Sequence, residues 1–159
     1  MPKDSRHIHA EQRFRLSKTV AAPAQYVYEW LTDYRADDGK LSRSHARYKV
    51  VRVGDDRLVR IRIVSPVSGN SSVAVDLIRL YPPSAWHTDQ IDETDLATVD
   101  YRVTRLAPKR SRIDVRVLER WMTPKYPQPA EYRKSTSEYW DHLVSALEKR
   151  YRSGKPAIG

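Results

Sequence analysis

The sequence contains no cysteine, only five glycines and one phenylalanine, and no long apolar run. Without cysteine the chain has no disulfide framework, no thiol nucleophile and no thiolate metal site. No window has the run of about 20 apolar residues that spans a bilayer, and residues 1–7 lack the apolar middle of a secretory signal. We therefore expect a cytoplasmic protein with no transmembrane segment.

The length of 159 residues suffices for one domain with a sizeable core and is too small for two ordinary domains. Polar residues dominate positions 1–11, and positions 154–159 include two glycines and a proline. We expect a flexible N-terminal tail over residues 1–11, one folded domain over 12–153 and a flexible C-terminal tail over 154–159.

The formal net charge is +9, and many of the arginines alternate with aliphatic residues. In segment 57–64, Arg60 and Arg62 alternate with valine and isoleucine, and segment 111–117 repeats the pattern with side chains of both signs. Such alternation predicts strands with one apolar face toward the core and one charged face toward solvent, where opposite charges pair between neighbouring strands. We therefore do not expect this protein to bind nucleic acid.

Short candidate strands follow one another through the middle of the chain. They are separated by turn-forming glycine, proline, aspartate and asparagine residues, and such short links predict an antiparallel meander. The candidate strands cover about residues 47–53, 57–64, 72–81, 85–91, 96–106 and 110–121.

A helix is predicted on each side of this meander. An alternating strand over 14–20 leads directly into an amphipathic helix from Pro23 to Tyr34, where the proline occupies a position that needs no N–H. After a proline-rich link over 123–129, apolar side chains recur at helical spacing to the end of the domain. That face carries Tyr132, Thr136, Trp140, Leu143, Leu147 and Tyr151. A one-sided sheet and a one-sided helix bury each other, so the fold class is α+β.

This order of elements, and the segment from Val20 to Tyr34 in particular, resembles the START-like superfamily, also called SRPBCC, over about residues 12–152. The resemblance implies the helix-grip fold of the birch pollen allergen: a curved antiparallel sheet of about seven strands around a long C-terminal helix, with short helices after the first strand. It also implies an apolar cavity that holds lipids, polyketides, sterols, quinones or hormones in different members. Other members are polyketide cyclases or interaction proteins.

Aromatic rings and hydroxyl groups mark one end of this implied cavity. The first half of the C-terminal helix is rich in them, whereas its second half presents Leu143 and Leu147, which suit a packed core. An aromatic stripe of this kind is also compatible with a cavity filled by side chains. We expect a ligand to contact Trp86, Tyr101, Tyr132, Thr136, Tyr139 and Trp140.

Catalytic chemistry has weaker support in the sequence. The five histidines form no pattern of two histidines and a carboxylate, so we expect no metal site and no cofactor. His87, Asp89 and Glu119 are candidates for acid–base work if they face the cavity. Alternation leaves open whether Trp86 or His87 points inward.

Three functions remain open at this point. The first is binding or transport of a hydrophobic small molecule, lipid-, polyketide- or quinone-like, with no covalent chemistry. The second is a polyketide cyclase or dehydratase, which needs a shaped cavity and one proton-transfer group. The third is an interaction module that docks an acidic partner through the basic surface. The sequence determines neither the ligand nor the oligomeric state.

Overall fold

A computed structural model describes residues 7–38, 46–64 and 72–159. The meander strands lie within one residue of their predicted positions, and the first strand begins earlier than predicted. The elements are β1 (Ala10–Val20), α1 (Ala24–Thr32), β2 (Ala46–Arg52), β3 (Arg57–Val64), β4 (Ser72–Tyr81), β5 (Ala85–Ile91), β6 (Asp95–Ala107), β7 (Arg110–Trp121) and α2 (Pro129–Arg152).

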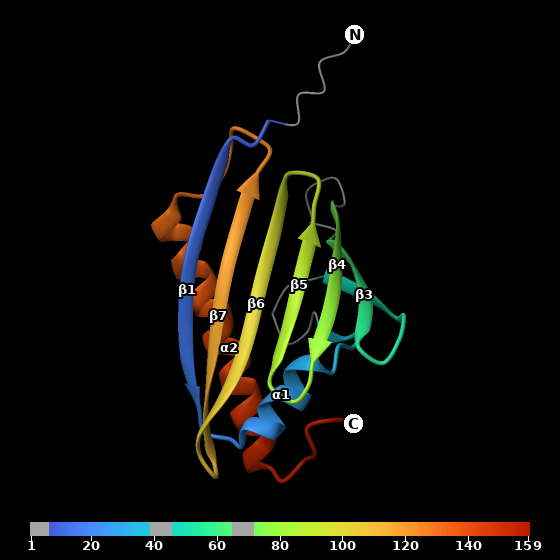
Figure 1. Cartoon of the computed structure of the whole chain (residues 1–159), viewed down its shortest axis with the longest axis vertical. Coiled ribbons are helices and arrows are strands. Elements are labelled where there is room, and N and C mark those ends of the chain that lie inside the picture. The colour runs from blue at the N-terminus through green and yellow to red at the C-terminus, as the bar shows by residue number, and fades with distance from the viewer. Residues whose placement is uncertain (1–6, 39–45, 65–71) are drawn as a thin grey trace.

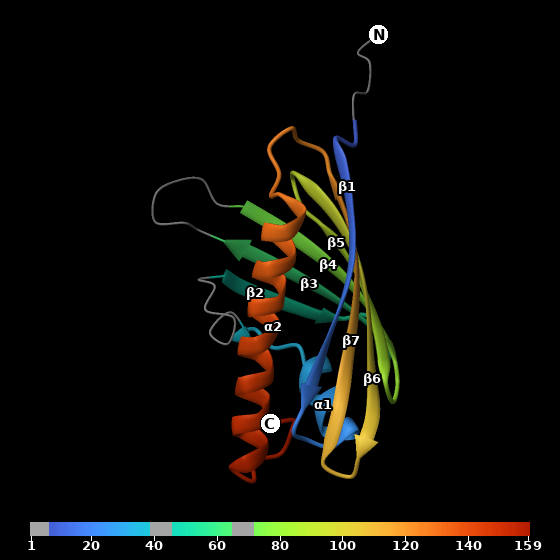
Figure 2. The same cartoon turned by 90° about the vertical axis from the view of Figure 1, so that its left-hand side faces the viewer.

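The strands form one seven-stranded antiparallel sheet in the order β1-β7-β6-β5-β4-β3-β2 (Figure 1). The sequence from β2 to β7 is a meander, and β1 joins it by pairing with β7. Figure 2 shows α2 lying along one face of the sheet, which curves so that β2, β3 and β4 pass behind the helix. This is the helix-grip architecture that the sequence predicts.

The helix α1 begins where the sequence places it. Pro23 adopts an extended conformation with φ −61° and ψ 145°, and its carbonyl accepts the first helical hydrogen bond from the Val27 N–H at 3.0 Å. The helix ends at Thr32, just before Tyr34. A second short helix, which the resemblance implies, would fall near residues 35–45, of which 39–45 lie outside the described residues. No helix in the described part of the chain combines the length and apolarity needed to cross a bilayer.

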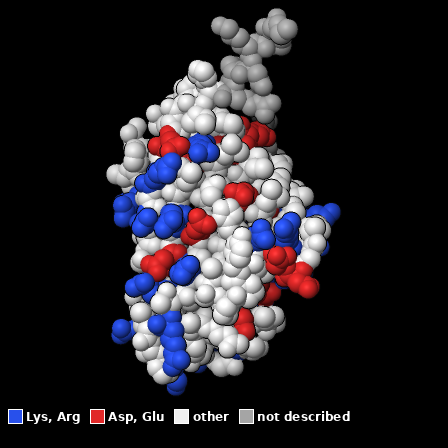
Figure 3. All heavy atoms as spheres, in the orientation of Figure 1, with Lys and Arg blue, Asp and Glu red and all other residues white. Residues whose placement is uncertain are grey.

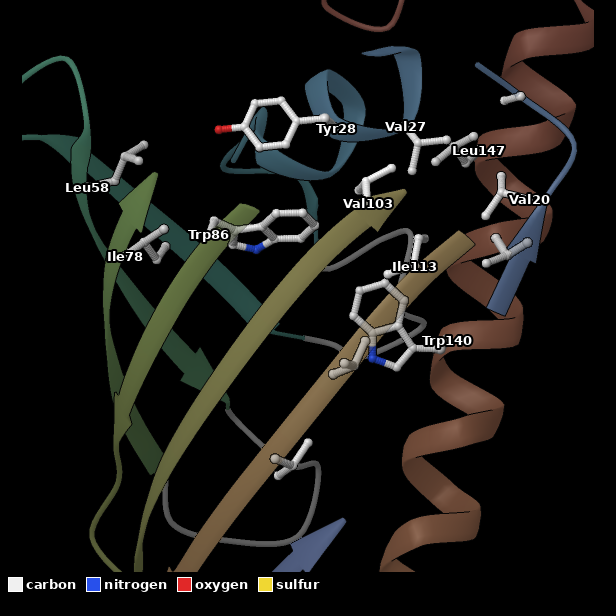
Figure 4. Close-up of a cluster of buried hydrophobic side chains, with 14 residues drawn as sticks. Val20, Val27, Tyr28, Leu58, Ile78, Trp86, Val103, Ile113, Trp140 and Leu147 are labelled. Atoms are coloured by element: carbon white, nitrogen blue, oxygen red, sulfur yellow. The ribbon is translucent and has the colours of Figure 1, made fainter. Parts of the chain in front are cut away.

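The packed core lies at the end of the molecule that holds α1 and the second half of α2. Val27 of α1 and Leu147 of α2 have no exposed surface, and Val103 and Ile113 come up to them from the sheet. Figure 4 shows these side chains together, with Trp140 extending from α2 farther along the groove between helix and sheet. Leu147 therefore has the core position that its spacing predicts.

One prediction about the sheet faces is wrong. The strand β3 turns Arg60 inward, and its side chain is 19% exposed, while the aliphatic residues at 59, 61 and 63 lie on the outer face. Leu58 on the inner face is buried in the core. Alternation defines two faces of a strand but does not say which one meets the helix. On β7 the prediction is confirmed, because Ile113, Val115 and Val117 are buried.

Both ends of the described chain contact the domain. The His9 N–H donates to the Trp121 carbonyl at 2.7 Å, so the sheet extends into the region expected to be a tail. At the other end, the Tyr26 hydroxyl donates to the Lys155 carbonyl at 2.9 Å, and Ala157 is buried. The Lys155 carbonyl therefore lies against the first turn of α1.

Candidate functional site

A cavity of about 510 Å³ lies between the inner face of the sheet and α2, which lines it from Tyr132 to Arg150. Its wall also includes the end of α1 and the residues that follow it. All six residues that the sequence analysis assigned to a ligand cavity line this one space: Trp86, Tyr101, Tyr132, Thr136, Tyr139 and Trp140.

Aromatic rings in contact with one another form one wall of the cavity. Trp86 on β5 stacks on its cross-strand partner Tyr101 on β6, with ring centroids 4.6 Å apart and an angle of 8° between the rings. Tyr101 meets Trp140 of α2 at 5.8 Å, and Trp140 meets Tyr139 edge-on at 6.2 Å. Tyr139 remains 40% exposed, so it lies at the open margin of the wall. The face of β5 that the sequence left undecided is thus settled: Trp86 and Thr88 are buried.

Another part of the cavity wall carries a positive charge that the sequence analysis placed in solvent. The Arg60 guanidinium lies between the rings of Tyr34 and Tyr48, at 5.0 and 4.7 Å from their centroids. Its Nε donates to Asp76 Oδ2 at 2.7 Å, and Asp76 is 1% exposed. Burial opposes the charge on Arg60, but the carboxylate outweighs it and raises the pKa of the guanidinium.

A signal for this pair was present in the sequence. Asp76 is the only acidic residue in the otherwise aliphatic run from Val73 to Ile78. A buried carboxylate almost always has a partner, so Asp76 predicts a cation on the same sheet face. Arg60 is its direct neighbour in the strand register.

Polar groups gather where the chain leaves α1. Arg35 Nε donates to Asp33 Oδ2 at 2.6 Å, and the Arg35 N–H donates to Asp38 Oδ2 at 3.0 Å. All three residues line the cavity. Burial raises the pKa of the Asp38 carboxyl. This segment is therefore a polar part of the cavity rim, beside the Arg60 wall.

A buried carboxyl lies next to the tyrosine end of α2. The Tyr132 hydroxyl donates to Glu119 Oε2 at 2.6 Å, and Glu119 is 1% exposed. The other oxygen, Oε1, is buried and has no hydrogen-bond partner among the described residues. Burial, together with the nearby Asp95 carboxylate, raises the pKa of Glu119 to about 9. The Tyr132 ring, held edge-on against Phe14 and Trp121, connects this acid to the cavity.

The other two acid–base candidates lie on the outer face of the sheet. His87 Nδ1 is 2.7 Å from Asp100 Oδ1, and His87 Nε2 is 3.1 Å from Asp89 Oδ1. Burial opposes the charged ring, but the two carboxylates outweigh it and raise the pKa of His87. Of the three candidates, only Glu119 is on the cavity side.

No protein-family model and no curated protein matches this sequence. Solved structures do match its fold. The Zhui aromatase/cyclase from Streptomyces sp. R1128 superposes with a TM-score of 0.72 at 16% identity, covering 91% of this chain and 98% of that one. A START superfamily protein from Mycobacterium smegmatis gives 0.65 at 18% identity, covering 89% and 97%.

A third similar structure is Ara h 8.0201, with a TM-score of 0.68 at 14% identity, covering 91% of this chain and 99% of that one. Each likeness extends over almost the whole of both chains, so it concerns the complete fold and not one motif. The sheet order, the short helix after β1 and the long α2 agree with it. The chain therefore has the helix-grip fold of the START-like, or SRPBCC, superfamily.

Proposed function

We propose that this protein binds and carries a largely hydrophobic small molecule with one polar end, such as a lipid-, polyketide- or quinone-like compound. The observation that carries the proposal is the cavity itself. Its volume of about 510 Å³ lies within the usual range for small-molecule sites, and its walls combine aromatic and aliphatic side chains with charged groups at Asp33, Arg35, Asp37, Asp38, Arg60 and Arg150. Proteins of the same fold include an aromatase/cyclase.

The aromatic stack of Trp86 and Tyr101 and the guanidinium of Arg60 together support one orientation for this ligand. The stacked rings of Trp86 and Tyr101 suit a planar or acyl body, because aromatic faces contribute large contact areas. Arg60 suits a carbonyl, phenol or carboxylate oxygen, because a guanidinium has five N–H donors and only one of them, Nε, is used by Asp76 in the bond described above. Asp76 offsets the charge of Arg60, so the polar end of the ligand need not be ionised.

Titration with N-phenyl-1-naphthylamine, an uncharged apolar dye, tests the proposal. We expect the dye to bind the folded protein, and Tyr139→Ala to weaken binding about tenfold while the melting temperature changes little, because Tyr139 is a half-exposed part of the wall. Tyr81→Ala is the matched control: Tyr81 is 48% exposed and does not line this cavity. Absence of dye binding, or equal losses in both variants, would show that the cavity does not take ligands.

Native mass spectrometry of the purified protein tests the same proposal without a chosen probe. We expect a carrier to retain a bound compound through purification. The complex would then have a mass above that of the chain alone. Release of that compound on denaturation would identify it.

A second candidate function is a cyclase or dehydratase, and Glu119 is the observation that favours it. A carboxyl group with a pKa of about 9 stays protonated at neutral pH, and Tyr132 connects it to the cavity. Such a group can donate a proton to a leaving hydroxyl or a carbonyl oxygen. In this case Glu119→Gln retains binding of the naphthylamine dye and loses turnover of a poly-β-keto thioester. Turnover that is unchanged in Glu119→Gln would leave binding as the function.

A further inference from the structure

One row of residues crosses the inner face of the sheet over six strands, and five of its six members are polar. The strand register pairs each member with the next, from β3 through β4, β5, β6 and β7 to β1. We call these residues the polar row; they are Arg60, Asp76, Gln90, Ala97, Glu119 and Gln12. All of them except Arg60 and Gln90 are buried, and these two line the cavity together with Ala97.

Polar side chains in this position need partners. On the outer face of the sheet water supplies them, and Figure 3 shows blue and red side chains interspersed along the side of the molecule where β1 and β7 lie. On the inner face a polar atom must bond to the protein or to a ligand. The next row on that face has one hydroxyl among six residues, which are Leu58, Ile78, Thr88, Val99, Val117 and Phe14. The polar row is therefore a distinct feature of the cavity side.

The β3 end of the polar row offers hydrogen-bond donors. Arg60 lines the cavity, and its Nε donates to Asp76 at 2.7 Å. A guanidinium has five N–H donors and no acceptor, so this bond leaves most of its donors for other groups. This end of the cavity suits a carbonyl or carboxylate oxygen.

At the other end of the row, two buried oxygens have no hydrogen-bond partner in the part of the chain that the structure describes: Glu119 Oε1 and Gln12 Oε1. They belong to direct neighbours in the register. The Gln12 amide nitrogen already donates to the Pro127 carbonyl at 2.8 Å. A proton on Glu119 Oε1 satisfies both oxygens, because the carboxyl group can then donate to the amide oxygen. Burial and the nearby Asp95 carboxylate raise the pKa of Glu119, which favours the same protonated form.

The Tyr132 hydroxyl connects this end of the row to the cavity. It donates its hydrogen to Glu119 Oε2 at 2.6 Å, and Tyr132 lines the cavity. Burial raises the pKa of Tyr132, so the phenol keeps that hydrogen. A phenol whose hydrogen is used can still accept a hydrogen bond through its oxygen. The two ends of the row therefore need opposite partners, an acceptor at Arg60 and a donor at Tyr132.

The two ends are far enough apart to hold two ends of one molecule. Arg60 and Glu119 are four strand spacings apart in the row, roughly 19 Å along the backbone of the sheet. Between them the cavity wall contains the short side chain of Ala97, with Val99 and Val117 in the next row. An apolar chain can cross this part of the wall.

We propose that the ligand carries two oxygen functions at opposite ends of an apolar body. A carbonyl or carboxylate oxygen accepts from Arg60, and a hydroxyl group donates to the Tyr132 oxygen. The ligand class is thus a hydroxylated acyl compound. This proposal rests on the binding function proposed above and adds the second polar end.

Displacement of bound N-phenyl-1-naphthylamine by matched acids tests the proposal. An apolar cavity without a partner for the hydroxyl binds a hydroxy acid less tightly than the plain acid, because burial of an unpaired hydroxyl costs free energy. We expect the opposite order here, with 12-hydroxydodecanoate binding about tenfold more tightly than dodecanoate. The oxygen of 12-methoxydodecanoate cannot donate, so this acid should show no gain. In a series from octanoate to hexadecanoate, the gain should be limited to the chain lengths that reach both ends of the row.

The variant Tyr132→Phe removes the accepting oxygen. We expect it to abolish the preference for the hydroxy acid and to change the affinity for dodecanoate by less than about threefold. Tyr126→Phe is the matched control, because Tyr126 stacks on Trp121 in the same region and does not line the cavity. Thermal melts of both variants check that they fold. The comparison of acids on the wild-type chain needs no variant and is decisive by itself.

The outcomes separate this proposal from the binding function. Equal or weaker binding of the hydroxy acid to the wild-type chain overturns the second polar end, and so does a preference that persists in Tyr132→Phe. In both cases the dye and dodecanoate still bind, and the carrier function stands. A wild-type chain that binds no dye overturns both proposals.

Discussion

Glu119 makes the stability of this protein depend on pH in a defined direction. Burial raises the pKa of its carboxyl group from the ordinary 4.5 to about 9. The folded chain then keeps a proton on Glu119 that the unfolded chain releases above about pH 4.5. The contribution of Glu119 to stability is therefore complete below pH 4.5 and is lost as the pH rises through 9.

The variant Glu119→Gln isolates this effect. Glutamine keeps the shape of the protonated acid and still accepts the hydrogen bond from Tyr132, but it does not titrate. We expect the melting temperature of the variant to rise relative to wild type as the pH increases from 5 to 9. Thermal melts at five pH values in that interval provide the measurement. A constant difference between the two proteins would mean that Glu119 is ionised in the folded state.

Arg60 is a second residue whose position decides the character of the site. A planar guanidinium can lie between two tyrosine rings while its Nε bonds a carboxylate, and lysine offers no such plane. Because Asp76 is buried, a lysine at position 60 would leave the carboxylate with a poorer partner. The aromatic pair and Asp76 therefore favour arginine specifically at this point of the cavity wall.

At the scale of the element, the buried side of α2 contributes both to the cavity wall and to the packed core. Leu147 is fully buried in the core, whereas Leu143 is only partly buried and lines the cavity. We expect Leu147→Ala to reduce the free energy of unfolding by about 2–5 kcal/mol, the usual range for a buried leucine, and Leu143→Ala to reduce it by clearly less. Urea denaturation of both variants measures the difference. Equal losses would place Leu143 in the packed core and shorten the cavity.

The faces of the strands show how far the sequence predicts the site. On β7 the aliphatic face is continuous from Ile113 to Val117 and turned inward as predicted, because the opposite face holds charges that pair in solvent. On β3 the same pattern predicted the wrong inward face, because Arg60 points inward and the aliphatic residues that alternate with it lie outside. The inward position of Arg60 depends on Asp76, Tyr34 and Tyr48, which come from other elements. A pattern within one strand cannot contain that information.

The helix α2 was more informative than the strands. The sequence separated a tyrosine end from a leucine end. Leu147 is in the core as predicted, but Leu143, which the sequence also assigned to the core, is only partly buried and lines the cavity. A helix packed on a sheet has one buried stripe, so spacing determines which residues lie inward. Whether the inward side chains fill the space between helix and sheet depends on the distance between the two. The sequence of the helix does not specify that distance.

For the whole molecule, we predict that the net charge of +9 does not lead to strong binding of nucleic acid. Several cations are paired with carboxylates: Arg60 inside the fold, Arg112 and Arg120 on the outer sheet face, and Lys18, whose Nζ lies 2.7 Å from Asp141. Phosphate binding in proportion to charge requires cations that are free to release counterions, and a paired cation releases few.

We therefore expect duplex and single-stranded DNA to bind this protein weakly and only at low salt. A filter-binding titration in 20 mM salt should give a shallow curve, and the binding should disappear by about 150 mM, where surface charges are screened over about 8 Å. Arg112→Ala serves as a control, because removing a paired cation should hardly change the affinity. Submicromolar affinity at 150 mM salt would contradict this expectation. It would mean that the positive charges act together despite their carboxylate partners, and that the basic surface, in addition to the cavity, belongs to the function of the molecule.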